Sequence, residues 1–195
     1  MPAFRKSSIS ANKRPYGQRR FEYWYRDNTV YFLTARCRAK FAAFESKAAK
    51  EIFWDRFTHY CGRYEFVPFV TSLMDNHYHC LGYLKVGENL GTFMRHLHGS
   101  VAKMVNDLLV VHLKPFWFDA GKQGYFDGCI RDEMQCRRAY RYTLTQSVRH
   151  GICAEWRRYP HTRINIDVDQ AVKRALQLKA FMTGVPYRRY LHPPG

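Results

Sequence analysis

The sequence predicts an α+β fold, a ferredoxin-like or RRM-like sandwich in which an antiparallel sheet carries helices on one face. Extended runs rich in β-branched and aromatic residues occupy residues 28–38, 64–74 and 77–86. Apolar residues with helical spacing follow the first run, at 46–61, and the third run, at 90–113. The order strand, helix, strand, strand, helix is that of a split βαβ unit.

The first half of the chain contains the clearest element boundaries. The run NTVYFLTARCR predicts a strand, and Gly62 is expected to stop the helix that follows it. Asp75-Asn76 indicates a turn between the second and third strands, which are therefore expected to be antiparallel. The apolar residues of the helix recur at helical spacing: Ile52, Phe53, Phe57, Tyr60 and Cys61.

The second half is expected to be mainly helical. Asn89 is a candidate N-cap for the helix at 90–113, and Pro115 marks its end. The aromatic, glycine-punctuated segment 114–130 predicts a strand or hairpin with loops. Two more helices are expected, at 132–150 with Gly151 just beyond it, and at 167–182.

The charge of the chain indicates a polyanionic partner. The 195 residues include 32 Lys and Arg against 16 Asp and Glu, a formal net charge of +16. Nucleic acid is the first candidate partner and an anionic membrane surface the second. A hydrophobic content of 46% excludes a disordered polymer. No apolar run approaches the roughly 20 residues that span a bilayer.

The first twenty residues carry six basic residues and no acid, without the apolar region of a secretory signal. They are expected to form a flexible basic arm that either tracks phosphates or has no role. The cysteines show no C-x-x-C spacing, which argues against a zinc ribbon and favours reduced thiols in a cytoplasmic protein. They are Cys37, Cys61, Cys80, Cys129, Cys136 and Cys153.

Two histidines, His77 and His79, lie one residue apart in the third predicted strand. Residues i and i+2 of a strand point to the same face, so both imidazoles can reach one divalent ion. His96 and His98 share this spacing but lie in a predicted helix, where such residues diverge by about 200°. The alternative is a pair of ordinary strand histidines hydrogen-bonded to their neighbours.

The segment 137–151 offers a candidate partner for these histidines. Tyr142 and Gln146 are four residues apart and share one face of a predicted helix. An amide oxygen is a metal ligand or an orienting group, and a tyrosine hydroxyl can attack phosphorus. Alternatively, Tyr142 belongs to the core and Gln146 is a solvated polar residue. The same helix carries arginines suited to phosphate contacts, Arg137, Arg138, Arg141 and Arg149.

Several segments, in order, resemble the HUH single-tyrosine transposases, and among these the REP-associated tyrosine transposases. MDNHYHCLGYL resembles the metal motif of that family, and ENLGTFMRHLHGSVAKMVN the helix after it. RYTLTQSVRHGIC resembles the helix of the nucleophile, and EWRRYPHT the short segment that follows. The resemblance spans residues 23–162 and implies an IS200-like transposase domain.

The resemblance implies a role for each matching residue. His77, His79 and Gln146 would bind Mg²⁺ or Mn²⁺, and Tyr142 would attack a single-stranded DNA phosphate at a hairpin-forming repeat. A 5′-phosphotyrosine bond and a free 3′ hydroxyl would result, without ATP. The resemblance also implies a C-terminal helix that carries the nucleophile, and a protein that acts as a monomer or a homodimer.

The chain departs from the family pattern at three places. Asp75 replaces the usual Pro, Tyr78 stands between the histidines, and Gln146-Ser147 replaces Asn-Pro. Tyr140 is a rival nucleophile, about 200° from Gln146 around the helix. Further candidate DNA contacts are Arg14, Arg19, Arg20, Arg95 and Lys103, together with the tail residues Arg188 and Arg189.

Three parts are expected: a basic arm at 1–20, the transposase domain at 21–163, and a helix with a basic tail at 164–195. The alternative function is a domesticated, non-catalytic protein that binds DNA hairpins. An RNA-binding module is a third class, but the chain lacks the K/R-G-F/Y-G/A-F pattern of such modules. The expected location is the cytoplasm, in association with the nucleoid.

Overall fold

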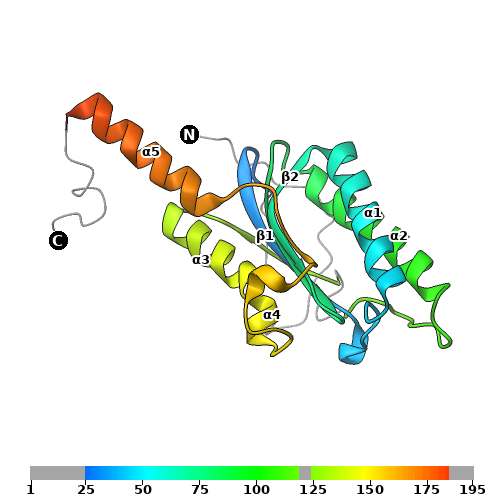
Figure 1. Cartoon of the computed structure of the whole chain (residues 1–195). Coiled ribbons are helices and arrows are strands. Elements are labelled where there is room, and N and C mark those ends of the chain that lie inside the picture. Colours follow the sequence, from blue (N-terminus) through cyan, green and yellow to red (C-terminus); the bar gives the residue numbers. More distant parts are fainter. Residues whose placement is uncertain (1–24, 119–123, 185–195) are drawn as a thin grey trace, which may run out of the picture.

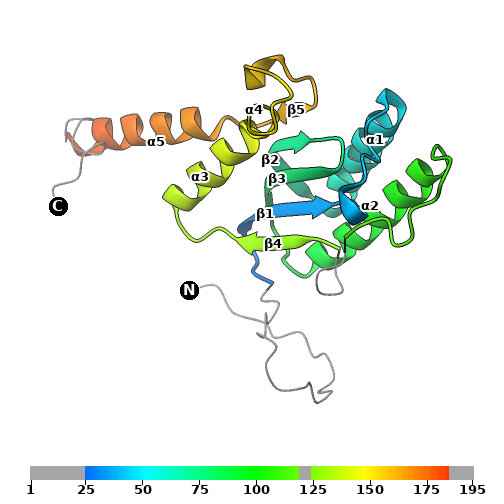
Figure 2. The same ribbon diagram turned by 90° about the horizontal axis from the view of Figure 1, so that it is seen from below.

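A computed structural model describes residues 25–118 and 124–184. One antiparallel sheet contains its five strands in the order β4-β1-β3-β2-β5 (Figure 2). The order of the first four strands is that of the ferredoxin-like fold, so the predicted α+β class is confirmed. The strands are β1 (Thr29–Arg36), β2 (Phe66–Leu73), β3 (His77–Leu84), β4 (Phe126–Cys129) and β5 (Thr162–Ile164).

Helices cover both faces of this sheet (Figure 1). Helices α1 (Lys47–Tyr64) and α2 (Asn89–Asn106) pack together on one face, while α3 (Glu133–Leu144) contacts β2 and β3 from the other. The short helix α4 (Gln146–Arg149) follows α3, and α5 (Val168–Thr183) extends away from the sheet. Two 3₁₀ turns, η1 (Arg38–Lys40) and η2 (Trp156–Arg158), complete the described elements.

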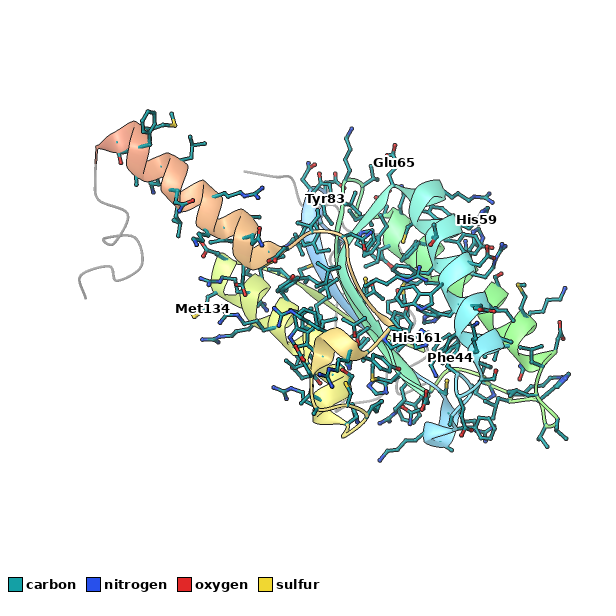
Figure 3. All side chains as sticks on the ribbon, in the orientation of Figure 1. Phe44, His59, Glu65, Tyr83, Met134 and His161 are labelled. Carbon is teal, nitrogen blue, oxygen red and sulfur yellow. The ribbon has the colours of Figure 1, made fainter. Side chains whose placement is uncertain are left out.

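Each face of the sheet has its own apolar core. The larger core lies under α1 and α2 and includes Phe53, Tyr78 and Phe44, which is labelled in Figure 3. The smaller core lies under α3 and α5, where Tyr140 packs with a few aliphatic residues of the sheet and helices. Because side chains alternate along a strand, Tyr78 points into the large core and its neighbours His77 and His79 point towards α3.

Two predicted helix ends are wrong, each for a local reason. Helix α1 continues through Gly62 and ends at Tyr64, because Glu65 takes the left-handed conformation with φ 53°. Helix α2 ends at Asn106, seven residues before the predicted end. The side chain of Asn106 accepts a hydrogen bond from the Leu113 amide at 2.8 Å and donates one to its carbonyl at 3.1 Å, which closes the chain into a loop.

The predicted helix at 132–150 is interrupted at Thr145, which separates α3 from α4. The Thr145 hydroxyl donates to the carbonyl of Arg141 at 3.0 Å, and Gly151 has a φ of 68° just beyond α4. Strand β5 was not predicted, whereas α5 begins one residue after its predicted start. The predicted basic arm at 1–20 and the tail residues Arg188 and Arg189 lie outside the described residues.

All six cysteines have free thiols in the structure. Within residues 25–118 and 124–184, no helix combines the length and the apolar character needed to cross a membrane.

Candidate active site

The paired histidines lie on the central strand β3, opposite β1. In the register of the sheet, His79 faces Thr34 and His77 faces Arg36. Both imidazoles are buried, and their ring centroids are 5.1 Å apart. His96 and His98 instead diverge: His96 contacts the Tyr64 hydroxyl, whereas His98 lies 2.9 Å from the Tyr78 hydroxyl in the core. The prediction that only the strand pair shares a face is confirmed.

Hydrogen bonds orient both imidazoles. The Asn76 amide nitrogen donates to the Lys40 carbonyl at 3.1 Å, which leaves its Oδ1 2.6 Å from Nδ1 of His77. A carbonyl oxygen can only accept, so His77 carries its proton on Nδ1 and has a lone pair on Nε2. Nδ1 of His79 lies 2.7 Å from the Thr34 hydroxyl, so its Nε2 is likewise left for the site.

Burial keeps these imidazoles neutral. Desolvation, together with the neighbouring His150, lowers the pKa of His77 to about 4. Desolvation, together with His77, lowers the pKa of His79 to about 3. Neutral imidazole is the form that binds a metal ion. At neutral pH both side chains are therefore in the protonation state that a metal ligand requires.

Gln146 reaches the histidines from the junction between α3 and α4. Its side chain is fully buried, and Nε2 donates to the Tyr142 carbonyl at 2.9 Å. That carbonyl belongs to the last turn of α3, where helix carbonyls lack their usual partners. Because Nε2 is held in this way, Oε1 is the atom left for the histidines, and a contact with Gln146 raises the pKa of both.

The histidine nitrogen and the glutamine oxygen that face each other here are both lone-pair donors, which a cation can bridge. With Nδ1 protonated, Nε2 of neutral His77 and the amide oxygen of Gln146 are both acceptors and cannot satisfy each other. In the described part of the chain, no group of three or more His, Cys, Asp or Glu side chains could hold a metal ion. At this point of the described structure, the donors within reach of one cation belong to the mixed set His77, His79 and Gln146.

Tyr142 lies beside these donors and is partly exposed. Its ring meets the His79 ring edge-on at 5.2 Å, and the Arg149 guanidinium lies 4.9 Å from its centroid. Tyr140, the rival candidate, is buried in the smaller core, and its pKa is raised to about 12, mainly by burial. The structure thus brings Tyr142, and not Tyr140, to the histidines.

His150 is a site residue that the sequence interpretation missed. Its ring centroid lies 4.8 Å from that of His77, and its side chain is exposed at the end of α4. His150 is four residues after Gln146, so the i, i+4 spacing that joined Tyr142 to Gln146 was the available signal.

The predicted DNA-binding residues fall into three groups. Arg137 and Arg141 project from α3 and both bind the Asp169 carboxylate of α5, at 2.9 and 3.0 Å. Arg138 and Arg149 are exposed on the site side without a carboxylate partner among the described residues. The other candidates are not brought to the site: Arg95 and Lys103 lie on α2, across the sheet, and Arg14, Arg19 and Arg20 lie outside the described residues.

The fold and the site define an α+β protein with two histidines, a glutamine and a tyrosine at one face of a ferredoxin-like sheet. A solved REP-associated tyrosine transposase bound to a REP hairpin has the same fold, with a TM-score of 0.59 and 15% sequence identity over 79% of this chain and 82% of that chain. The resemblance in the sequence is thus confirmed at the level of the fold.

A second similar structure is a protein from Deinococcus radiodurans R1, provisionally described as a transposase. The match covers 68% of this chain and 95% of that chain, with 11% sequence identity and a TM-score of 0.44. No protein-family model matches the chain, and no curated protein matches it.

Proposed function

We propose that the protein is a metal-dependent single-strand DNA endonuclease and strand transferase that acts at hairpin-forming repeats. The observation that carries this proposal is the meeting of Tyr142 with His79 at 5.2 Å, while Gln146, from the same helical segment, contacts both histidines. The candidate nucleophile and the candidate metal donors are therefore adjacent. Their roles follow from the chemistry of these groups and from the family resemblance.

In this proposal the Tyr142 hydroxyl oxygen attacks a DNA phosphorus. A bond forms between phosphorus and the tyrosine oxygen, the bond to the 3′ oxygen breaks, and that oxygen takes up a proton as the tyrosine loses one. His77, His79 and Gln146 would hold Mg²⁺ or Mn²⁺, which supplies Lewis-acid polarisation of the phosphate. The phosphotyrosine bond keeps the energy of the phosphodiester, so rejoining to another 3′ hydroxyl needs no ATP.

Two further observations support DNA as the substrate. The transposase with the same fold was solved with a REP hairpin bound to it. This chain carries a net charge of +16, and exposed arginines flank Tyr142 on the site side of the sheet. Electrostatic attraction to phosphate supplies most of the affinity in non-specific DNA binding. Stem contacts and unpaired flanks would together select a hairpin.

The test uses the full chain and single-stranded hairpin DNA taken from palindromic repeats that flank its own gene. With Mg²⁺ or Mn²⁺ we expect a covalent protein–DNA product on a denaturing gel, lost in excess EDTA and in Tyr142→Phe. His77→Ala should also lose it, whereas His96→Ala is the matched control and should keep it. Hairpin binding with no covalent product under any of these conditions would instead indicate the non-catalytic alternative.

A further inference from the structure

A groove of about 710 Å³ lies beside Tyr142, between the sheet and α3. Its volume falls within the roughly 300–1,000 Å³ typical of small-molecule sites. Its sheet side includes Phe32, Phe126 and Gly128, and its helix side includes Arg138, Arg141, Tyr142 and Arg149. One side is thus mainly apolar and the other is basic.

The apolar side presents aromatic surface. Phe126 is 57% exposed although it is a large hydrophobic residue on a strand. Phe32 stacks on His79 at 5.7 Å and meets Tyr142 edge-on at 5.9 Å. Phe32 therefore joins the groove to the candidate catalytic residues. Exposed aromatic rings of this kind are the surfaces on which unpaired bases stack.

The basic side holds two arginines available to an anion. Arg141 is bound by Asp169, but the only polar contact of Arg138 in the described part of the chain is with the Met134 sulfur, a weak acceptor. Figure 3 shows Met134 on the outer side of α3. Arg149 donates to Thr145 at 3.2 Å and lies over Tyr142. Neither guanidinium is neutralised by a described carboxylate.

A missing side chain keeps the groove open. Gly128 pairs with Phe32 across the β4–β1 ladder, and it lies between Phe126 and Ile130 on the same face of the strand. A Cβ at Gly128 would meet nothing closer than the Phe126 ring at 3.5 Å, an ordinary contact. A larger side chain would thus enter the groove without displacing the backbone.

We propose that this groove, the Tyr142 groove, binds one unpaired base of single-stranded DNA next to the attacked phosphate. The base stacks against Phe126 and Phe32, and Arg138 and Arg149 contact the phosphates on either side. The proposal rests on the proposed function, because it names where the strand at Tyr142 lies. A paired base cannot enter in this way, so the groove would select single strands.

The experiment measures binding in EDTA, where no cleavage is expected. The probe is fluorescein-labelled oligothymidylate of about twelve nucleotides, within the usual range of single-strand sites. We expect Gly128→Leu and Phe126→Ala each to weaken binding about 5- to 100-fold. Gly99→Leu is the matched control, since Gly99 is exposed on α2 with nothing within 4 Å of its Cβ position, and it should bind like the wild type.

A second measurement locates the base directly. Oligothymidylate with 5-iodouracil in place of thymine should photocross-link to Phe126 or Phe32, as mapped by mass spectrometry, and Gly128→Leu should abolish that cross-link. A duplex of the same length should neither cross-link there nor respond to Gly128→Leu.

Unchanged binding by Gly128→Leu, or cross-links confined to other surfaces, would overturn the proposal that the Tyr142 groove binds an unpaired base. Because these readouts need no covalent product, failure of the groove and failure of the nuclease proposal are distinguishable.

Discussion

The side chain of Gln146 and the backbone of Tyr142 are joined by a hydrogen bond of 2.9 Å, from the amide nitrogen to the carbonyl oxygen. This bond settles which end of the amide faces the histidines. It also ties a candidate metal ligand to the candidate nucleophile through four residues of chain. A substitution at Gln146 should therefore weaken metal binding more than it destabilises the fold.

We predict that Gln146→Ala weakens Mn²⁺ binding by about 10-fold or more, because one oxygen donor is lost and the histidine rings lose a contact. Gln146→Glu should bind Mn²⁺ at least as tightly as the wild type, since a carboxylate oxygen replaces the amide oxygen. Titration calorimetry with Mn²⁺ alone measures both. Gln135→Ala, on the exposed surface of α3, is the control. Equal affinity of Gln146→Ala and the wild type would remove Gln146 from the site.

The two tyrosines of α3 should respond in opposite ways to loss of their hydroxyls. Tyr142→Phe keeps the ring that contacts His79 and should melt like the wild type, yet form no covalent product with hairpin DNA. Tyr140→Phe should still form the product, because Tyr140 is buried in the smaller core. Gel assays and thermal melts together decide this. A covalent product from Tyr142→Phe would contradict the assignment.

His98 should make the stability of the protein sensitive to acid. Burial lowers its pKa from the ordinary 6.5 to about 3, so the folded protein holds it neutral. Below pH 6.5 the unfolded chain takes up a proton there and the folded chain does not. The free energy of unfolding from this source is therefore constant above pH 6.5 and falls towards pH 3, by up to about 1.4 kcal/mol per pH unit.

Urea unfolding at several pH values measures this slope. His98→Gln should show a flatter decline than the wild type between pH 6.5 and pH 4. His59→Gln, at an exposed position on the outer face of α1 (Figure 3), is the control substitution. Parallel curves for His98→Gln and the wild type would show that His98 is not held neutral.

Asp75 should stabilise the turn that leads into the histidine strand. Its carboxylate lies 2.6 Å from the Lys50 ammonium, which is largely buried, and its carbonyl accepts from the Phe44 amide. Asp75→Ala leaves that ammonium with the Glu45 carbonyl at 3.3 Å, so we expect a loss of about 1–3 kcal/mol in denaturant unfolding. Lys47→Ala breaks only the exposed pair with Glu51 and should cost at most about 0.5 kcal/mol.

Asp169 should restrain DNA binding by α3. It holds Arg137 and Arg141, and Arg141 lines the Tyr142 groove. Asp169→Asn therefore frees the Arg141 guanidinium beside the groove, whereas Arg137 keeps its ion pair with Glu133 at 3.7 Å. We expect tighter binding of single-stranded DNA and a steeper dependence on salt, by about 0.7 in log–log slope for each new phosphate contact. Fluorescence anisotropy against NaCl concentration measures both. Asp55→Asn, which frees Arg56 on α1, is the control, and weaker binding by Asp169→Asn would contradict the prediction.

The sequence predicted those parts of the fold and site that depend on local periodicity. The alternation of β3 placed His77 and His79 on one face, and helical spacing placed Tyr142 and Gln146 together. The helix ends were harder, because they depend on single side-chain contacts. Asn106 ends α2 by binding Leu113, and the Thr145 hydroxyl binds back to α3; neither contact leaves a signal in hydrophobic periodicity.

The parts that sequence reasoning missed depend on contacts between distant segments. Arg137 donates a hydrogen bond to Asp169, which lies 32 residues later in the sequence. That this arginine is already paired with a carboxylate could be recognised only from the packing of α5 against α3. Strand β5 is three residues long and pairs with β2 at the edge of the described sheet. It is too short to show a period-2 pattern in the sequence.

The hydrogen bond between Thr34 and His79 joins residues that are direct partners in the β1–β3 ladder. A slip of one residue between these strands would replace Thr34 by an apolar neighbour and turn the histidines towards the wrong core. If His77 and His79 bind a metal ion as proposed, Mn²⁺ binding by the free protein would report correct pairing of β1 with β3. Mn²⁺ binding measured after refolding would distinguish molecules with the native strand register from compact molecules in which β1 and β3 are mispaired.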